Sequence, residues 1–173
     1  MAMSSARSTP RPPTVLIADD DAAVRESLSR LLRAEGYEVR TAPSGAAVLE
    51  LMQQAPEGLD LALLDLNMPG KNGWATLDRL FETRPGLPVV ILTGLPNQRP
   101  LAEATGVRAL VEKPVPVEAL LQLLEQLLAE GEPGRPETPV LPAFRHLRPA
   151  STVVRRYQAL QSITPYTPGG LNE

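Results

Sequence analysis

The sequence contains no cysteine and only one histidine, His146. Without thiols the protein has no disulfides, no thiolate zinc site and no cysteine nucleophile. A single histidine late in the chain also argues against a histidine-rich metal site and against a Ser/His/Asp triad in a folded core. The chemistry open to this protein therefore belongs to carboxylates, hydroxyls, amides and a few cations.

Basic residues are not in excess, because Lys and Arg number 17 against 20 Asp and Glu, for a formal net charge of -3. General nucleic-acid-binding proteins usually carry a surplus of cations, so direct DNA binding is not expected. Long apolar runs are also missing, since none approaches the roughly 18 to 20 residues of a membrane helix. The first residues lack the apolar core of a secretory signal. We expect a soluble, cytoplasmic protein without membrane contact.

Five short apolar segments alternate with helical patterns along most of the chain. The segments have the composition of buried strands and cover residues 14–18, 37–41, 59–66, 88–93 and 107–111. Apolar residues at helical spacing follow each strand, although the fourth helix is reduced to about residues 101–105 and the last covers residues 116–129. This alternation predicts an α/β fold, doubly wound, with a parallel sheet covered on both faces.

Polar side chains stand where the predicted strands end. Asp19 and Asp20 follow the first strand, Asp65 the third, Thr93 the fourth and Lys113 the fifth. Functional groups gather at these ends in doubly wound sheets. Three carboxylates against one lysine give -3 + 1 = -2, a charge that one divalent cation cancels, and magnesium suits an open acidic cleft. Because a lysine and a hydroxyl suit phosphate oxygens, we predict phosphoryl transfer.

Four motifs in this order resemble the receiver domain of two-component response regulators. They are VLIADDD at residues 15–21, DLNMPG at 65–70, ILTG at 91–94 and VEKP at 111–114. The resemblance covers about residues 14–129 and implies a flavodoxin-like, five-stranded sheet of strand order 2-1-3-4-5.

The resemblance also implies roles for individual residues. Asp65 is expected to take a phosphoryl group from the histidine of a sensor kinase or phosphotransfer protein. Asp20 and Asp65 are expected to bind magnesium directly, Asp19 through water and Asn67 through its backbone carbonyl. The protein would then be a self-phosphorylating and self-dephosphorylating switch, without separate substrate turnover, that signals to an unidentified downstream protein by contact.

The motifs after the fourth and fifth strands complete the resemblance and contain its departure. Thr93 and Lys113 are expected to bind the phosphoryl oxygens, and the peptide bond from Lys113 to Pro114 to be cis. Three residues before this lysine the family often has an aromatic switch residue, and here Leu110 stands in that place. The resemblance therefore supports phosphoacceptance better than it supports the form of the output signal.

Other interpretations of the same residues remain open. The aspartates after the first strand could merely begin a helix, Thr93 could be only the last strand residue, and Lys113 could be solvated. The domain could also be a pseudo-receiver, a scaffold that binds partners without phosphorylation. A dehalogenase-type phosphatase would need an aspartate where Asn67 stands, and neither a P-loop nor a glycine-rich dinucleotide turn is present.

The two ends of the chain differ in composition from the predicted domain. Residues 1–13 are expected to form a disordered arm, and residues 130–173 a proline-rich tail that opens with a linker over 131–142. Within the tail, residues 151–163 have the pattern of a short amphipathic helix, which would need a surface to dock on. Such a helix could carry the output signal, and the alternative is a disordered end without consequence.

Overall fold

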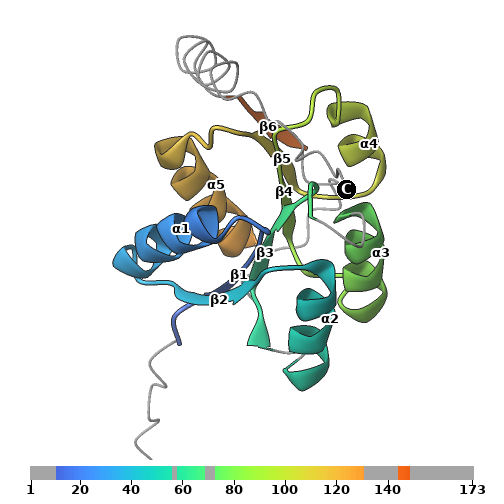
Figure 1. Cartoon of the computed structure of the whole chain (residues 1–173). Coiled ribbons are helices and arrows are strands. Elements are labelled where there is room, and N and C mark those ends of the chain that lie inside the picture. The colour runs from blue at the N-terminus through green and yellow to red at the C-terminus, as the bar shows by residue number, and fades with distance from the viewer. Residues whose placement is uncertain (1–10, 56–57, 69–72, 131–143, 149–173) are drawn as a thin grey trace, which may run out of the picture.

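The computed structural model describes residues 11–55, 58–68, 73–130 and 144–148, and these form a sheet between two layers of helices (Figure 1). The sheet has strand order β2-β1-β3-β4-β5-β6, and every neighbouring pair is parallel. The strands are β1 (Thr14–Ala18), β2 (Glu38–Ala42), β3 (Leu61–Asp65), β4 (Val89–Thr93), β5 (Ala109–Glu112) and β6 (Arg145–Leu147). The predicted doubly wound α/β fold and its order 2-1-3-4-5 are confirmed, with one strand added.

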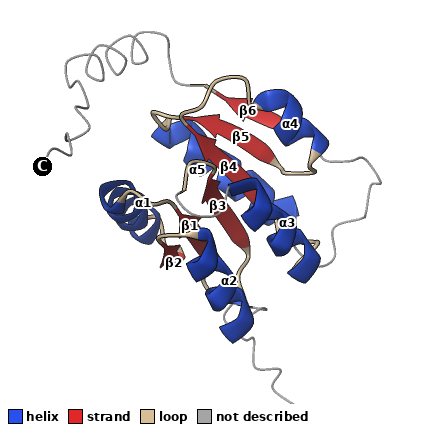
Figure 2. Ribbon diagram, turned by 45° about the vertical axis from the view of Figure 1, so that its right-hand side comes forward, coloured by secondary structure: helices blue, strands red, loops and turns tan. Residues whose placement is uncertain are grey.

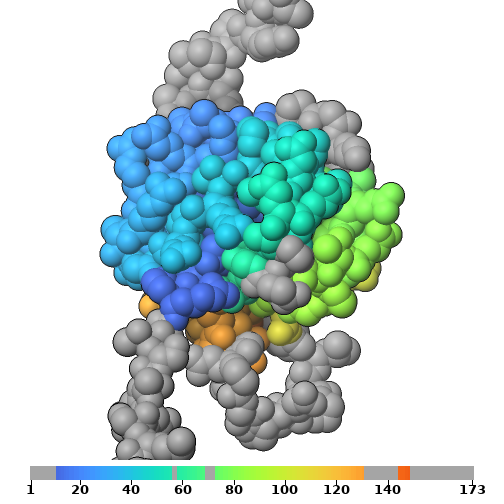
Figure 3. Space-filling view, turned by 90° about the horizontal axis from the view of Figure 1, so that it is seen from below, coloured from blue at the N-terminus to red at the C-terminus, as the bar shows by residue number. Residues whose placement is uncertain are grey.

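Among the described residues, five helices cover the sheet: α1 (Ala22–Ala34), α2 (Gly45–Gln54), α3 (Gly73–Thr83), α4 (Arg99–Ala104) and α5 (Val117–Glu130). One face carries α1 and α5, and the other carries α2, α3 and α4 (Figure 1). β1, β3 and β4 are buried along their whole length, because helices lie on both of their faces. The space-filling view shows α1, α2 and α3 following one another across this face of the molecule (Figure 3). No described helix is long and apolar enough to span a bilayer.

Local sequence explains where the helices begin. The side chain of Asp21 caps α1 by accepting hydrogen bonds from the backbone N–H groups of Ala23 and Val24, and the Ser44 hydroxyl caps α2. Helix α4 is as short as predicted, but it begins at Arg99, with Pro100 in its first turn, where a missing N–H costs nothing. The difference from the expected start at residue 101 follows from this position.

The sequence predicted a sheet that ends at β5, but the sheet of the structure continues with a sixth strand. β6 lies on the outer edge of β5, with Ala109 opposite Arg145 and Val111 opposite Leu147 (Figure 2). This strand lies within the segment predicted as a proline-rich tail, so the folded unit includes residues beyond 129. The expected linker over residues 131–142 and the expected helix over residues 151–163 lie wholly outside the described residues.

The N-terminal arm is shorter than expected. Arg11 donates to the Asp60 carboxylate at 2.9 Å, and the Pro13 carbonyl accepts a hydrogen bond from the backbone N–H of Glu38 at 2.9 Å. Because these contacts join residues 11–13 to the sheet, the predicted disordered arm over 1–13 is wrong for its last three residues. Residues 1–10 lie outside the described part of the chain.

Candidate functional site

Three carboxylates meet at the C-terminal edge of the sheet. Asp19 directly follows β1, Asp20 follows it, and Asp65 is the last residue of the neighbouring strand β3. One oxygen from each of the three lies within 4.8 Å of the others. Asp19 and Asp65 are 0% and 2% exposed, whereas Asp20 is exposed. The predicted convergence is therefore present, and its open side faces solvent through Asp20.

Lys113 joins the two buried carboxylates. Its Nζ lies 2.7 Å from Asp19 Oδ2 and 2.8 Å from Asp65 Oδ2. The side chain comes from the segment after β5, where the backbone N–H of Lys113 donates to the Thr93 carbonyl at 2.7 Å and the bond to Pro114 is cis. Burial alone would lower the pKa of Lys113, but the hydrogen bonds and charges of Asp19 and Asp65 outweigh it and raise this pKa. A solvated surface lysine is thereby excluded.

Asp19 is the most buried of the three acids, and this burial affects the pKa of its carboxyl group. Burial raises its pKa above the ordinary value, and the negative charge of Asp65 acts in the same direction. Hydrogen bonds from Lys113 and from the backbone N–H of Asp21 oppose this rise without cancelling it. Because three carboxylates meet one lysine here, a cation bound at the site would neutralise further negative charge.

Both oxygens of Asp65 are held by the protein. Oδ1 accepts the backbone N–H of Asn67 at 3.0 Å, while Oδ2 accepts from Lys113. Gly73 at the start of α3 makes this loop possible, because a Cβ there would lie 2.6 Å from the Leu66 Cα atom and 2.8 Å from the Asp65 carbonyl oxygen. The carboxylate of Asp65 is therefore fixed in direction at the end of β3.

The other residues named from the sequence surround this centre. Thr93 is 1% exposed, and its hydroxyl accepts a hydrogen bond from the backbone N–H of Leu95 at 2.9 Å; a hydroxyl that accepts can still donate its own proton, and no acceptor for it is found among the described residues. The backbone carbonyl of Asn67 as a metal ligand stays a prediction. Leu110 is 1% exposed inside β5 and lies opposite His146 of β6, away from the carboxylates.

Sequence reasoning missed Arg25. Its Nη1 donates to the backbone carbonyl oxygens of Asp19 at 2.8 Å and Asp20 at 2.9 Å, which fastens the acidic turn to α1. A signal existed, since a cation placed one helical turn after Asp21 lies on the side of α1 that faces this turn. The alternative that the aspartates merely begin a helix holds for Asp21 alone, because its carboxylate is used as the cap.

The arrangement fits a hard divalent cation. Carboxylate oxygens are the ligands that such ions prefer, and the exposed side at Asp20 leaves room for the waters that magnesium keeps. The cluster of Asp19, Asp20 and Asp65 could hold one ion within its 4.8 Å span. Lys113 beside the cluster adds a positive charge next to the fixed carboxylate of Asp65.

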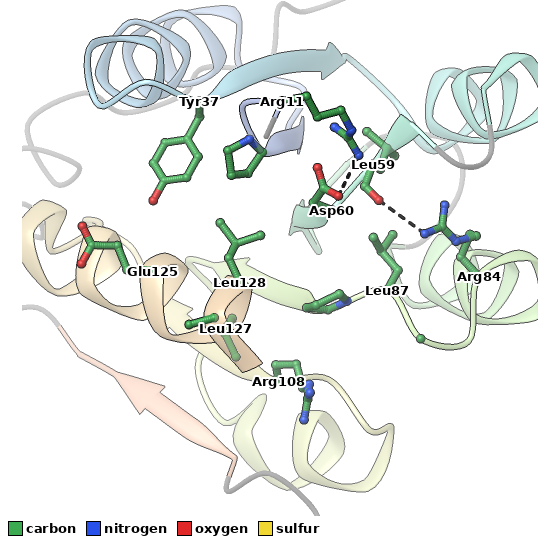
Figure 4. A pocket seen from close by; sticks show the side chains of 14 residues that line it. Arg11, Tyr37, Leu59, Asp60, Arg84, Leu87, Arg108, Glu125, Leu127 and Leu128 are labelled. Carbon is green, nitrogen blue, oxygen red and sulfur yellow. Dashed lines mark hydrogen bonds and ion pairs between the residues drawn. The ribbon is translucent and has the colours of Figure 1, made fainter. Parts of the chain in front are cut away.

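A separate hollow of about 850 Å³ lies at the opposite end of the sheet (Figure 4). Leu87, Leu127 and Leu128 are among its apolar walls, and the ion pair of Arg11 with Asp60 stands at its side. Asp60 precedes β3 and the leucines of α5 belong to that helix's last turn, so the hollow is at the N-terminal ends of the strands. The residues that carry the chemistry above are not among its lining.

Comparison with known proteins agrees with this geometry. The family model of the response regulator receiver domain matches residues 15–125. The transcriptional regulatory protein GlrR of Escherichia coli K12 is 34% identical over 129 residues, covering 73% of this chain and 29% of that protein. Response regulator MprA of Mycobacterium sp. strain KMS is 35% identical over 133 residues, covering 75% of this chain and 57% of that protein. The chain thus spans less than two thirds of the length of either relative.

Solved structures show the same likeness. A CheY-like receiver domain protein from Methanospirillum hungatei JF-1 superposes with a TM-score of 0.64 at 30% identity, over 69% of this chain and 95% of that one. A response regulator from Burkholderia pseudomallei, with a phosphorylated aspartic acid and a calcium ion, gives a TM-score of 0.60 at 26% identity, over 68% of this chain and 69% of that one.

Proposed function

The chain belongs to the response regulator receiver domain family, and from that premise we propose that it is a phosphoacceptor switch of a two-component phosphorelay. Asp65 takes a phosphoryl group from the histidine of a sensor kinase or phosphotransfer protein, and the signal passes on by protein contact. The observation that carries this proposal is the position of Lys113, with Nζ at 2.7 and 2.8 Å from Asp19 and Asp65. In this position the lysine neutralises two buried carboxylates, and its positive charge lies where an incoming phosphoryl group would need one.

The phosphoryl transfer begins at Asp65. One of its carboxylate oxygens attacks phosphorus, the bond from phosphorus to the imidazole nitrogen of the donor breaks, and that nitrogen keeps the electron pair. The product is an aspartyl phosphate. Hydrogen bonds from Lys113 and from the Asn67 N–H hold the nucleophile in place beforehand, which lowers the entropic cost of reaching the attacking geometry.

Magnesium is the cation proposed for the acidic cluster, with Asp19, Asp20, Asp65 and the Asn67 carbonyl as its direct or water-mediated ligands. When bound, this ion neutralises negative charge that develops as the phosphoryl group is transferred. The structural support is the set of three carboxylates within 4.8 Å, which Lys113 alone does not neutralise.

After transfer, the phosphoryl dianion recruits Lys113 and the free proton of the Thr93 hydroxyl. Lys113 follows β5 and Thr93 ends β4, and a hydrogen bond from the backbone N–H of Lys113 to the Thr93 carbonyl already links them. Their movement would bias a surface near these two strands toward one of two states. We place this switch in the cytoplasm, with no direct DNA contact and no turnover beyond its own phosphorylation and hydrolysis.

Incubation with magnesium and acetyl phosphate, followed by intact mass measurement, tests this proposal. The wild-type chain should gain one phosphoryl group that is lost under alkaline conditions, and Asp65→Asn should gain none, because an amide is a poor nucleophile. Asp78→Asn, an exposed change on α3, is the matched control and should behave as wild type. Phosphorylation of Asp65→Asn at the wild-type rate would refute the assignment, and no phosphorylation of any chain would favour the scaffold.

A further inference from the structure

The outer edge of β5 would be the edge of the sheet if β6 were absent. An edge strand presents a row of backbone N–H and C=O groups that can pair with an added strand. β6 uses this row in parallel register, with Ala109, Leu110 and Val111 opposite Arg145, His146 and Leu147. β6 lies beyond residues 15–125, which the receiver family model matches, so this fifth parallel pair adds to the part of the sheet that the model covers.

A carboxylate stands at each end of this edge, and each binds cations of the β6 segment. Glu130, the last residue of α5, pairs with Arg145 at 2.8 Å near the beginning of β5. At the other end Glu112 pairs with His146 Nε2 at 2.8 Å and with Arg148 at 3.3 Å. The edge therefore favours an extended segment with a positive charge at both ends.

Between the two carboxylates the edge is apolar. Phe144 packs against the core on the α2, α3 and α4 side, and Leu147 packs against the core on the α1 and α5 side. The side chains of an added strand thus alternate between the two faces of the sheet, as strand geometry requires. The chemistry of the edge matches the pattern aromatic, cation, histidine, aliphatic, cation.

The fit of β6 to this edge is incomplete. All three of its residues are only half-buried, and the Arg148 side chain is 68% exposed. Within the described residues, Glu130 Oε2 and Arg145 Nη1 are buried without a hydrogen-bond partner, although Arg108 lies 3.8 Å from the former. Unsatisfied buried polar atoms weaken an association, so the contact of β6 with the edge of β5 is weaker than a fully hydrogen-bonded one would be.

We propose that the edge of β5, bounded by Glu112 and Glu130, is a docking site for a basic extended strand of a partner protein, and that β6 occupies it in the resting chain. The partner adds its strand parallel to β5 after β6 has left, and its cations replace Arg145 and Arg148. The charge complementarity of the two carboxylates selects this partner chemistry. The proposal does not depend on phosphorylation of Asp65.

A synthetic peptide with the sequence of residues 142–150 provides the probe, and its binding to the full-length chain is measured by NMR of ¹⁵N-labelled β5 without magnesium or phosphodonor. In Arg145→Glu/Arg148→Glu the tethered strand is repelled and the edge is open. This variant should bind the peptide at least about tenfold more tightly than wild type, because a tethered competitor has an effective concentration in the millimolar range. Leu147→Asp, which opens the edge by removing the apolar contact, should behave in the same way.

Charge recognition is tested in the open-edge chain. Adding Glu112→Gln and Glu130→Gln should weaken peptide binding about tenfold, and a peptide with glutamate at the positions of Arg145 and Arg148 should not bind. Binding that is absent, equal in wild-type and open-edge chains, or insensitive to the two glutamates would overturn the proposal. A wild-type dimer that disappears in the open-edge chain would assign the edge to a second copy instead, and would also overturn it.

Discussion

Replacement of Lys113 by methionine should destabilise the magnesium-free protein strongly, and magnesium should restore most of the loss. The lysine side chain is 18% exposed, while those of Asp19 and Asp65 are 0% and 3% exposed, so the pairs that it forms are largely shielded from water. Methionine has nearly the same length, which limits the effect to charge and hydrogen bonding. What remains are two buried carboxylates without a cation.

The size of the loss follows from this geometry. Breaking a buried ion pair by removing one partner typically costs about 3 to 5 kcal/mol, because the other charge stays buried and unpaired. Because the lysine side chain is itself 18% exposed and therefore partly screened by water, we take the lower end of this range and expect a loss of about 3 kcal/mol in the free energy of unfolding.

Urea unfolding at pH 8, with and without saturating magnesium, measures this loss. Alkaline buffer keeps Asp19 ionised, since protonation of a carboxyl whose pKa is already raised would otherwise limit the repulsion. Lys113→Arg keeps the charge and should lose much less. A cost below about 1 kcal/mol for Lys113→Met, or a cost of the same size in both buffers, would refute the electrostatic account.

Three further predictions concern the acidic turn. Asp20→Ala should weaken magnesium binding about tenfold by removing a direct ligand, and unchanged affinity in a titration followed by Trp74 fluorescence would contradict that role. Arg25→Met should also weaken magnesium binding, because the backbone carbonyls of Asp19 and Asp20 lose their hydrogen-bond donor. If Arg25 acted only through its positive charge, its removal would strengthen magnesium binding. Stronger binding would therefore exclude a positioning role for Arg25. For Asp19 the folded pKa is raised, so its contribution to stability is present below the ordinary value of 3.8 and is lost as pH rises through the folded pKa. Without magnesium, the free energy of unfolding of the wild type should therefore fall relative to that of Asp19→Asn as pH rises over that range. Chemical denaturation at several pH values measures both, and a difference between the two proteins that does not change with pH would contradict the prediction.

The sequence allowed the sheet and the acidic site to be predicted for one physical reason. A strand buried on both faces is a continuous apolar run, so its end is marked by the first charged residue, as at Asp19 and Asp65. Parallel strands bring such ends to one edge of the sheet, which places Lys113 with them. The strand boundaries shifted by one or two residues, as at β5, where Val107 is buried but precedes the ladder.

β6 could not be predicted in the same way. Arg145, His146 and Leu147 form neither an apolar run nor a polar and apolar alternation long enough to indicate a strand. Their conformation depends on Glu130 and Glu112, which come from two other elements, and on the open edge of β5. Arg25 escaped prediction for a related reason, since its partners are backbone carbonyls, which leave no mark in the sequence.

Two consecutive residues, Glu112 and Lys113, take part in the two proposed sites. Glu112 ends β5 and holds the β6 segment through His146 and Arg148, while Lys113, the next residue, holds the two buried carboxylates of the acidic site. Neighbouring side chains in an extended chain point to opposite sides, so one backbone serves both contacts. A shift of the Lys113 backbone toward a phosphoryl group would therefore also move Glu112. One peptide bond joins the residue that bounds the proposed docking edge to the lysine that contacts the proposed phosphorylation site, Asp65.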